Sequence, residues 1–115
     1  MAKATPSNPA LPNVVKDQLQ KLGHDLALAR KRRRTSLRDM AARMMVNLKT
    51  VKRMEQGDPS VGVGIIASAL WVLGLHRRLG ELAAPETDTA GLQEEISRLP
   101  RDFRKSRKRE DQYDF

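Results

Sequence analysis

The chain has 115 residues, no cysteine and a formal net charge of +8 at pH 7. This length fits one small domain with tails, and the lack of thiols excludes a disulfide framework and a cysteine-based metal site. No apolar run approaches the roughly 20 residues that a membrane-spanning helix needs, and no signal peptide is visible, so we expect a cytoplasmic protein without a membrane role.

The positive charge is concentrated in one part of the chain. Residues 21–57 hold eleven basic and three acidic residues, whereas residues 58–100 hold three basic and six acidic ones. Solubility alone does not require such a division. A polyanion is therefore expected to contact one end of the molecule only.

The chain begins with a segment in which no regular structure is expected. Residues 1–13 carry three prolines and small polar residues, which favours a flexible arm. A helix is predicted from about Asn13 to Arg33. Its inward stripe recurs every three or four residues: Val15, Leu19, Leu22, Leu26 and Ala29. Gly23 weakens the middle of this helix by about 1 kcal/mol relative to alanine.

Five consecutive cations, Arg30 to Arg34, end this helix. Cations complement the negative end of a helix dipole, so a solvated helix end is one interpretation. Five cations exceed what the dipole needs. We therefore favour a contact between this run and a phosphate backbone.

The stretch from Ser36 to Gly57 predicts two short helices joined by a tight turn. Ser36 is an N-cap with Asp39 at the spacing of a capping box, and Asn47 is a second N-cap. Apolar residues recur at helical spacing on one side of both helices: Leu37, Met40, Ala41, Met44, Val51 and Met54. Gly57 is expected to end the second helix as a C′ glycine.

The other face of the second helix carries a different set of side chains: Leu48, Lys49, Thr50, Lys52 and Arg53. A helix that is buried on one side and presents cations and a hydroxyl on the other suits a DNA major groove. A plain helical hairpin would explain the apolar spacing but leave the cationic face unexplained.

This pattern resembles the helix-turn-helix of the Xre or phage-repressor (Cro/C1-like) family over roughly residues 20 to 83. The resemblance implies an all-α, five-helix, lambda-repressor-like domain. In that family Ala41 lies where the two helices cross, Val46 lies in the turn and Asn47 caps the recognition helix. The family's ending, Val-x-x-(Ile/Leu)-Glu-x-Gly, falls on Val51, Met54, Glu55 and Gly57.

Two positions depart from this family pattern. The family usually has glycine where Met45 stands, because that residue often adopts a positive φ, so we expect the turn to differ locally. The first helix often opens with a glutamine that braces phosphate, and Leu37 in that place cannot do so.

The turn Asp58-Pro59-Ser60 precedes a fourth helix, predicted from about Val61 or Val63 to Leu73 and ended by Gly74. A fifth short helix is predicted from Leu75 to Leu82. This region is very apolar for a domain whose core is marginal alone, so we expect a dimer contact here. Its candidates are Trp71, Leu75 and Leu79.

A linker is predicted from Pro85 to Ala90, then a short amphipathic helix from about Thr89 to Arg98. Residues 101–115 carry two blocks of charge and are expected to be disordered, or to order on a partner. The possible anchors of this tail are Phe103, Tyr113 and Phe115. The expected organisation is an arm (1–13), a DNA-binding domain (14–84) and a C-terminal extension (85–115).

The run from Glu55 to Leu75 resembles one branch of the family, the HipB-type antitoxins, which are encoded beside a HipA-like serine/threonine kinase toxin. The matching features are the Gly-Asp-Pro turn, the Ala-Leu-x-x-Leu-Gly helix end and the Leu99-Pro100-Arg101 tail. The resemblance implies a homodimer that binds an inverted repeat in its own promoter, holds the toxin and represses jointly with it. A stand-alone repressor without a toxin is the alternative, because plain repressors share the same core.

Lys49 and Thr50 are the first choices for base readout, since they lie near the N-terminus of the recognition helix. Lys52 and Arg53 are expected to contact bases or flanking phosphates. The remaining predicted DNA-binding residues are Arg33, Arg34, Ser36, Arg38, Asn47 and Leu48.

No nucleophile elbow, phosphate loop or metal-ligand spacing appears in the chain. The two histidines, His24 and His76, lie on different predicted helices. We therefore expect no enzyme, no metal and no cofactor. A protein-binding adaptor or an RNA binder that uses the basic face without base readout is a third hypothesis.

Overall fold

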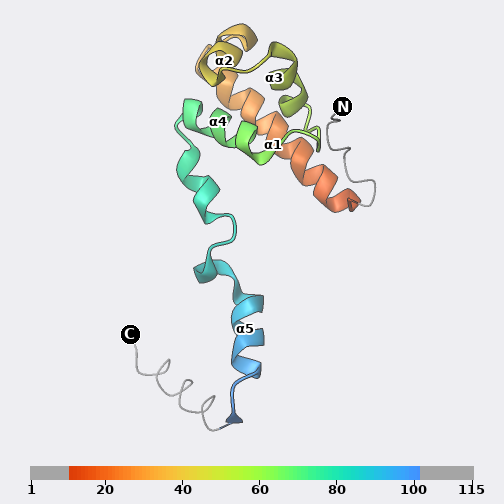
Figure 1. Ribbon diagram of the computed structural model, residues 1–115, viewed down its shortest axis with the longest axis vertical. Coiled ribbons are helices and arrows are strands. Elements are labelled where there is room, and N and C mark those ends of the chain that lie inside the picture. Colours follow the sequence, from red (N-terminus) through yellow and green to blue (C-terminus); the bar gives the residue numbers. More distant parts are fainter. Residues whose placement is uncertain (1–10, 102–115) are drawn as a thin grey trace. The chain divides into compact units, whose positions relative to one another are not determined.

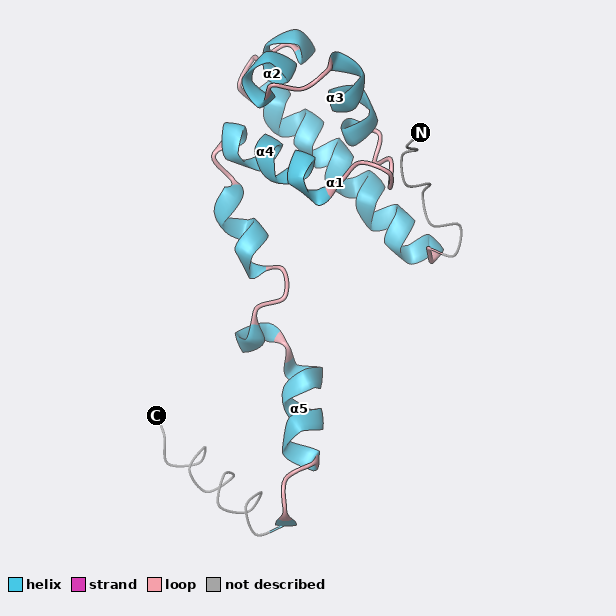
Figure 2. Cartoon of the chain, in the orientation of Figure 1, coloured by secondary structure: helices cyan, strands magenta, loops and turns pink. Residues whose placement is uncertain are grey.

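The computed structural model describes residues 11–101, and every regular element in this range is a helix (Figures 1 and 2). The elements in chain order are α1 (Asn13–Arg32), α2 (Leu37–Met44), α3 (Leu48–Glu55), α4 (Val63–Leu73), η1 (His76–Glu81), η2 (Pro85–Thr87) and α5 (Thr89–Ser97), where η marks a 3-10 helix. The predicted all-α class is confirmed for these residues. The predicted tail anchors Phe103, Tyr113 and Phe115, and most of the predicted arm, lie outside them.

The chain divides into two compact units after Leu79. In the first unit, α3 and α4 each contact both α1 and α2. These four helices bury a common apolar core: Leu26, Met40, Ala41, Met44, Val51, Met54, Ala69 and Leu73. The predicted inward faces of α2 and α3 are therefore confirmed, with Leu37 partly buried at the edge of the core.

The first turns of α1 extend past the other helices of this unit (Figure 1). Val15 was expected to face inward, but 38% of its surface is exposed. The prediction for Val15 is wrong because its helical turn has no neighbouring helix to pack against. Leu26, farther along the same stripe, is buried.

Gly23 lies where the end of α3 packs directly against α1. A Cβ atom on Gly23 would stand 2.6 Å from the Glu55 carbonyl oxygen and 2.8 Å from the Gly57 nitrogen. These are backbone atoms that a side chain cannot displace cheaply. The glycine therefore permits a close approach that offsets its poor helix propensity.

Both predicted N-caps of the α2–α3 pair are confirmed. The Ser36 hydroxyl accepts a hydrogen bond from the Asp39 N–H over 3.0 Å, and Asn47 Oδ1 accepts one from the Lys49 N–H over 2.8 Å. These side chains satisfy N–H groups that have no partner inside the helix. The Ser36 cap fixes the start of α2, and the Asn47 cap fixes the end of the turn that leads into α3.

The region after α4 differs from its prediction. Gly74 ends α4 with a φ of 78°, as expected. The fifth helix predicted from Leu75 to Leu82 is instead the 3-10 helix η1, and Leu82 lies beyond it with 77% of its surface exposed. The predicted linker contains the short helix η2. The α5 helix agrees with its prediction and is capped by Asp88, whose carboxylate accepts from the Gly91 N–H over 3.0 Å.

Candidate nucleic-acid interface

The α3 helix is buried on one side and charged on the other. Val51 is 0% exposed and Met54 is 3% exposed, so α3 is held by its inner face. On the outer face Lys49, Lys52 and Arg53 are exposed, whereas Leu48 and Thr50 are half-buried. Asn47, which caps the start of α3, is also exposed.

Further predicted phosphate contacts surround the beginning of α2. Arg33, Arg34, Ser36 and Arg38 are all exposed. Arg33 Nη1 donates to the Ala29 carbonyl over 2.7 Å and so also caps the end of α1. The Ser36 hydroxyl oxygen already accepts from Asp39, but its own proton can still be donated to a phosphate oxygen.

Arg30 does not have the role predicted for it. The residue is only 7% exposed. Its Nε and Nη2 atoms donate to the two carboxylate oxygens of Glu55 over 2.8 and 3.1 Å, and Nη1 donates to the Thr35 carbonyl over 2.9 Å. The predicted phosphate contact of Arg30 is therefore wrong, because its guanidinium is enclosed and bound inside the domain.

The sequence contains a signal for this pair that the prediction above did not use. Arg30 lies four residues after Leu26 on the buried stripe of α1, and Glu55 lies four residues after Val51 on the buried stripe of α3. Opposite charges that each continue an apolar stripe indicate a buried pair. The pair ties the end of α1 to the end of α3 and so contributes to seating α3.

The turn before α3 keeps its left-handed geometry despite the methionine. Met45 has φ 58° and ψ 42°, and its side chain is 90% exposed. The expected local difference is therefore wrong: the backbone accepts the left-handed conformation at a cost of about 1–2 kcal/mol. The exposed side chain meets no obstacle that would prevent it.

Arg53 is anchored to the loop that follows α3. Its Nε atom donates to Asp58 Oδ2 over 3.0 Å, and Nη2 donates to the Ser60 hydroxyl. Hydrogen bonds from the Ser60 N–H and hydroxyl, together with the Arg53 ion pair, hold the pKa of Asp58 below its ordinary value. Neither Asp58 nor Ser60 was predicted to be part of the interface.

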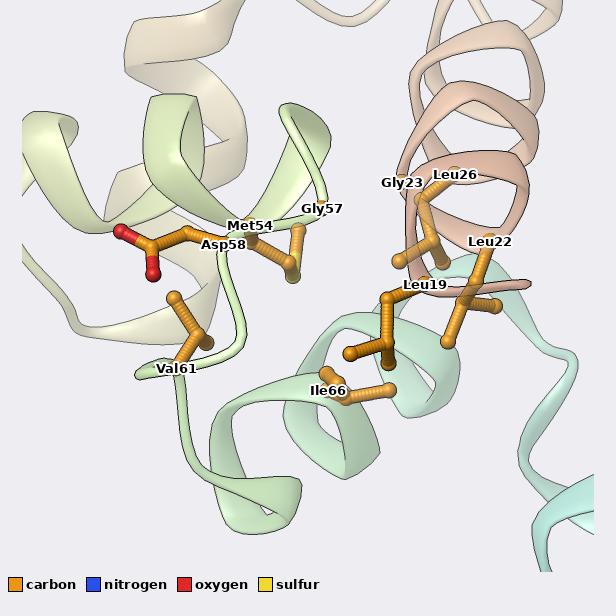
Figure 3. Close-up of a pocket in the computed structure, with 9 residues that line it drawn as sticks. All are labelled: Leu19, Leu22, Gly23, Leu26, Met54, Gly57, Asp58, Val61 and Ile66. Atoms are coloured by element: carbon orange, nitrogen blue, oxygen red, sulfur yellow. The ribbon is translucent and has the colours of Figure 1, made fainter. Parts of the chain in front are cut away.

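A small apolar cavity lies behind this loop, between α1, the end of α3 and α4 (Figure 3). Leu19, Leu22, Met54 and Ile66 line it, and its volume is about 20 Å³. That is room for about one water molecule, so the cavity is a packing gap and not a small-molecule site.

The predicted dimer residues are unequally exposed. Trp71 is 67% exposed on α4, whereas Leu75 and Leu79 are half-buried. Leu75 also packs against the core of its own unit. Trp71 is thus the largest apolar side chain that α4 offers to a partner.

Within residues 11–101 no group of three or more histidine, aspartate or glutamate side chains is placed to hold a metal ion. No helix in the same range is long and apolar enough to cross a membrane.

The chain matches no protein-family model, and searches of curated proteins and of solved structures also found no match. The support for a function therefore comes from the residues of the chain itself.

Proposed function

We propose that this chain is a sequence-specific DNA-binding repressor with a lambda-repressor-like domain, which acts as a homodimer in the cytoplasm. The observation that carries the proposal is the two-sided α3: Val51 and Met54 are buried, and Lys49, Lys52 and Arg53 are exposed. A rigidly seated helix with cations on its outer face fits a major groove, where lysine and arginine donate to guanine.

The charge of the surrounding residues supports DNA over an uncharged partner. Exposed arginines at the end of α1 and the start of α2 would meet the phosphates that flank a groove. In a symmetric dimer, two copies of α3 would enter successive major grooves about 34 Å apart. An inverted repeat would match that symmetry.

We further propose that the repressor is the antitoxin of a toxin–antitoxin module with a HipA-like kinase partner. This part rests on the Gly57-Asp58-Pro59 turn, the end of α4 and the Leu99-Pro100-Arg101 run, which resemble HipB-type antitoxins. The alternative is a stand-alone repressor. A kinase-like reading frame next to this one, whose product co-elutes with the chain after co-expression, would distinguish the antitoxin from the alternative.

A competition gel shift tests the DNA-binding role. The DNA upstream of the reading frame should displace bound probe far better than an unrelated duplex of equal length. Lys49→Ala should reduce this preference and cost about 1–3 kcal/mol at the preferred site. Equal competition by both duplexes would contradict sequence-specific binding and would favour an RNA-binding or adaptor role.

Arg33→Ala is the matched comparison for Lys49→Ala, since it removes a predicted phosphate contact. It should weaken binding to both duplexes equally and lower the slope of log affinity against log salt by about one ion. An identical slope at several salt concentrations would remove Arg33 from the interface.

A further inference from the structure

The end of α3 folds back so that residue 58 lies beside residue 53. Gly57 adopts a left-handed conformation with a φ of 75°. The Gly57 N–H donates to the Met54 carbonyl over 3.0 Å, and the Asp58 N–H donates to the Arg53 carbonyl over 3.1 Å. These two bonds form a Schellman motif. The backbone itself therefore places the carboxylate of Asp58 next to the Arg53 side chain.

The Asp58 carboxylate is fixed by the loop that follows it. Oδ1 accepts from the Ser60 N–H over 2.9 Å and from the Ser60 hydroxyl over 2.8 Å. Oδ2 accepts from Arg53 Nε over 3.0 Å, and the Ser60 hydroxyl accepts from Arg53 Nη2. Figure 3 shows the carboxylate pointing away from the apolar side chains of the cavity. We call these three bonded side chains, Arg53, Asp58 and Ser60, the α3 clamp.

The clamp occupies one edge of the guanidinium and leaves another available. An arginine carries five N–H donors in a planar fork. The hydrogen bonds found among the described residues use Nε–H and one N–H of Nη2. The two donors of Nη1 and the second donor of Nη2 point away from this edge. The side chain remains 46% exposed, so these donors can reach a bound molecule.

We infer that Asp58 and Ser60 are positioning residues for Arg53, and that the α3 clamp holds its guanidinium in the orientation from which it contacts a guanine edge. The inference rests on the proposed DNA-binding function. A guanidinium contacts guanine O6 and N7 with two parallel donors, so its orientation decides whether the contact forms. A side chain that is already held also loses less conformational freedom on binding.

The clamp predicts an effect of Asp58→Ala on sequence preference that the loss of a negative charge alone would not produce. Asp58→Ala removes a negative charge close to the DNA, which strengthens binding to every duplex. It also releases Arg53, which weakens only the contact with the correct base. The preference for the selected duplex over a shuffled one should therefore fall about threefold to tenfold, while affinity for the shuffled duplex stays constant or rises.

The test uses the full chain and two duplexes, one enriched from a random-sequence library on the wild-type protein and one with the same bases shuffled. Fluorescence anisotropy measures affinity for each. The control is Asp25→Ala, which removes an aspartate that is bonded to Lys21 over 2.7 Å on the surface of α1. This control removes the same charge outside the clamp and should leave the preference unchanged.

Two further variants keep the test decisive. Ser60→Ala removes the hydroxyl from the clamp and should lower the preference in the same direction by a smaller factor. Arg53→Lys keeps the charge but cannot make the clamp bonds together with a bidentate contact, so it should lose the preference with an unchanged salt slope. If Asp58→Ala does not fold, Ser60→Ala decides the matter, because it weakens the clamp and leaves the Arg53 guanidinium in place; an unchanged preference in Ser60→Ala then overturns the inference.

The outcomes separate the inference from the function on which it rests. A lower preference in Asp58→Ala, together with no further loss when Asp58→Ala is added to Arg53→Ala, supports the clamp. An unchanged preference in Asp58→Ala overturns the clamp but not the proposed function. The same holds if Asp58→Ala lowers the preference equally in the wild-type and the Arg53→Ala backgrounds. A wild-type protein that enriches no duplex overturns the proposed function and the clamp together.

Discussion

At the scale of single residues, the buried ion pair between Arg30 and Glu55 joins the end of α1 to the end of α3. Their side chains are only 9% and 12% exposed, and Arg30 Nη1 also donates a hydrogen bond to the Thr35 carbonyl. Such a pair contributes little net stability when complete, because desolvation offsets the attraction. Its loss is costly, however, since one charge remains buried without a partner.

Glu55→Ala should therefore destabilise the protein by about 3–5 kcal/mol. That is a large fraction of the roughly 5–15 kcal/mol that holds a domain together. Urea denaturation followed by circular dichroism measures the change. Asp25→Ala breaks the exposed Lys21–Asp25 pair and should have little effect. Recovery of most of the loss in an Arg30→Met, Glu55→Leu double variant would confirm that the isolated charge is the cause.

A second residue-scale prediction compares two helical glycines. Gly23→Ala places a Cβ against backbone atoms at 2.6–2.8 Å and should destabilise the domain by about 1–3 kcal/mol. A Cβ on Gly64, in α4, would meet no atom within 4 Å, so Gly64→Ala should stabilise by about 0.5–1 kcal/mol. Thermal unfolding of both variants is the measurement. A Gly23→Ala variant that is as stable as wild type would contradict the close packing of α1 on α3.

At the scale of the elements, the helix ends show which parts of the secondary structure could be predicted from the sequence. The N-caps Ser36 and Asn47 and the C-terminal glycines Gly57 and Gly74 were predicted correctly, because each acts through hydrogen bonds within a few residues. Arg34 and Met45, which follow the ends of α1 and α2, also adopt a left-handed backbone conformation, but neither is a glycine, so the sequence gives no local signal for it.

Contacts between residues that are far apart in the sequence are the part of the site that was not predicted. The exposed cations of α3 followed from helical periodicity alone. The partners of Arg30 and Arg53 did not, since Glu55 is 25 residues away and Asp58 meets Arg53 only through the reversal at Gly57. Periodicity also failed for Val15, because it shows which side of a helix is apolar but not where its neighbours end.

The loop after α3 should give the protein a characteristic pH dependence through Asp58. Hydrogen bonds from Ser60, and then the Arg53 ion pair, lower the pKa of Asp58 in the folded state. Its unfolded pKa is about 3.9. The unfolded state therefore binds more protons near that pH, so the stabilisation by Asp58 is complete above it and is lost as pH falls through the lower folded pKa.

Urea midpoints of wild type and Asp58→Asn measured between about pH 6 and about pH 3 test this dependence. The stability difference between the two proteins should be constant above about pH 5 and should shrink below about pH 4. A difference that stays constant down to the lowest pH would show that the Asp58 carboxylate is not stabilised by these bonds.

At the scale of the whole molecule, the uneven distribution of charge and of apolar surface points to two kinds of partner. Residues 21–57, from α1 to the end of α3, hold eleven basic and three acidic residues, which is where the proposed DNA would bind, while α4 presents its exposed tryptophan. The core of the described residues consists of only eight buried apolar side chains. A domain with so small a core gains stability from association, and an exposed aromatic side chain is the usual anchor of such a contact.

Trp71→Ser should therefore weaken self-association without unfolding the monomer. Loss of an aromatic anchor costs about 2 kcal/mol or more, which corresponds to a roughly 30-fold weaker dimer. Sedimentation velocity over a series of protein concentrations measures this shift. The control is Leu82→Ser, which removes a side chain that is 77% exposed but lies outside the predicted contact, and it should leave the dimer unchanged.

The same variant links the association of the protein to its proposed DNA binding. A dimer that holds both half-sites gains affinity because the second α3 binds at a high effective concentration. Trp71→Ser should thus bind a full inverted repeat much more weakly than wild type, but a single half-site equally well. If wild type sediments as a monomer at every concentration, or if Trp71→Ser remains as dimeric as wild type, the contact does not lie on this face of α4.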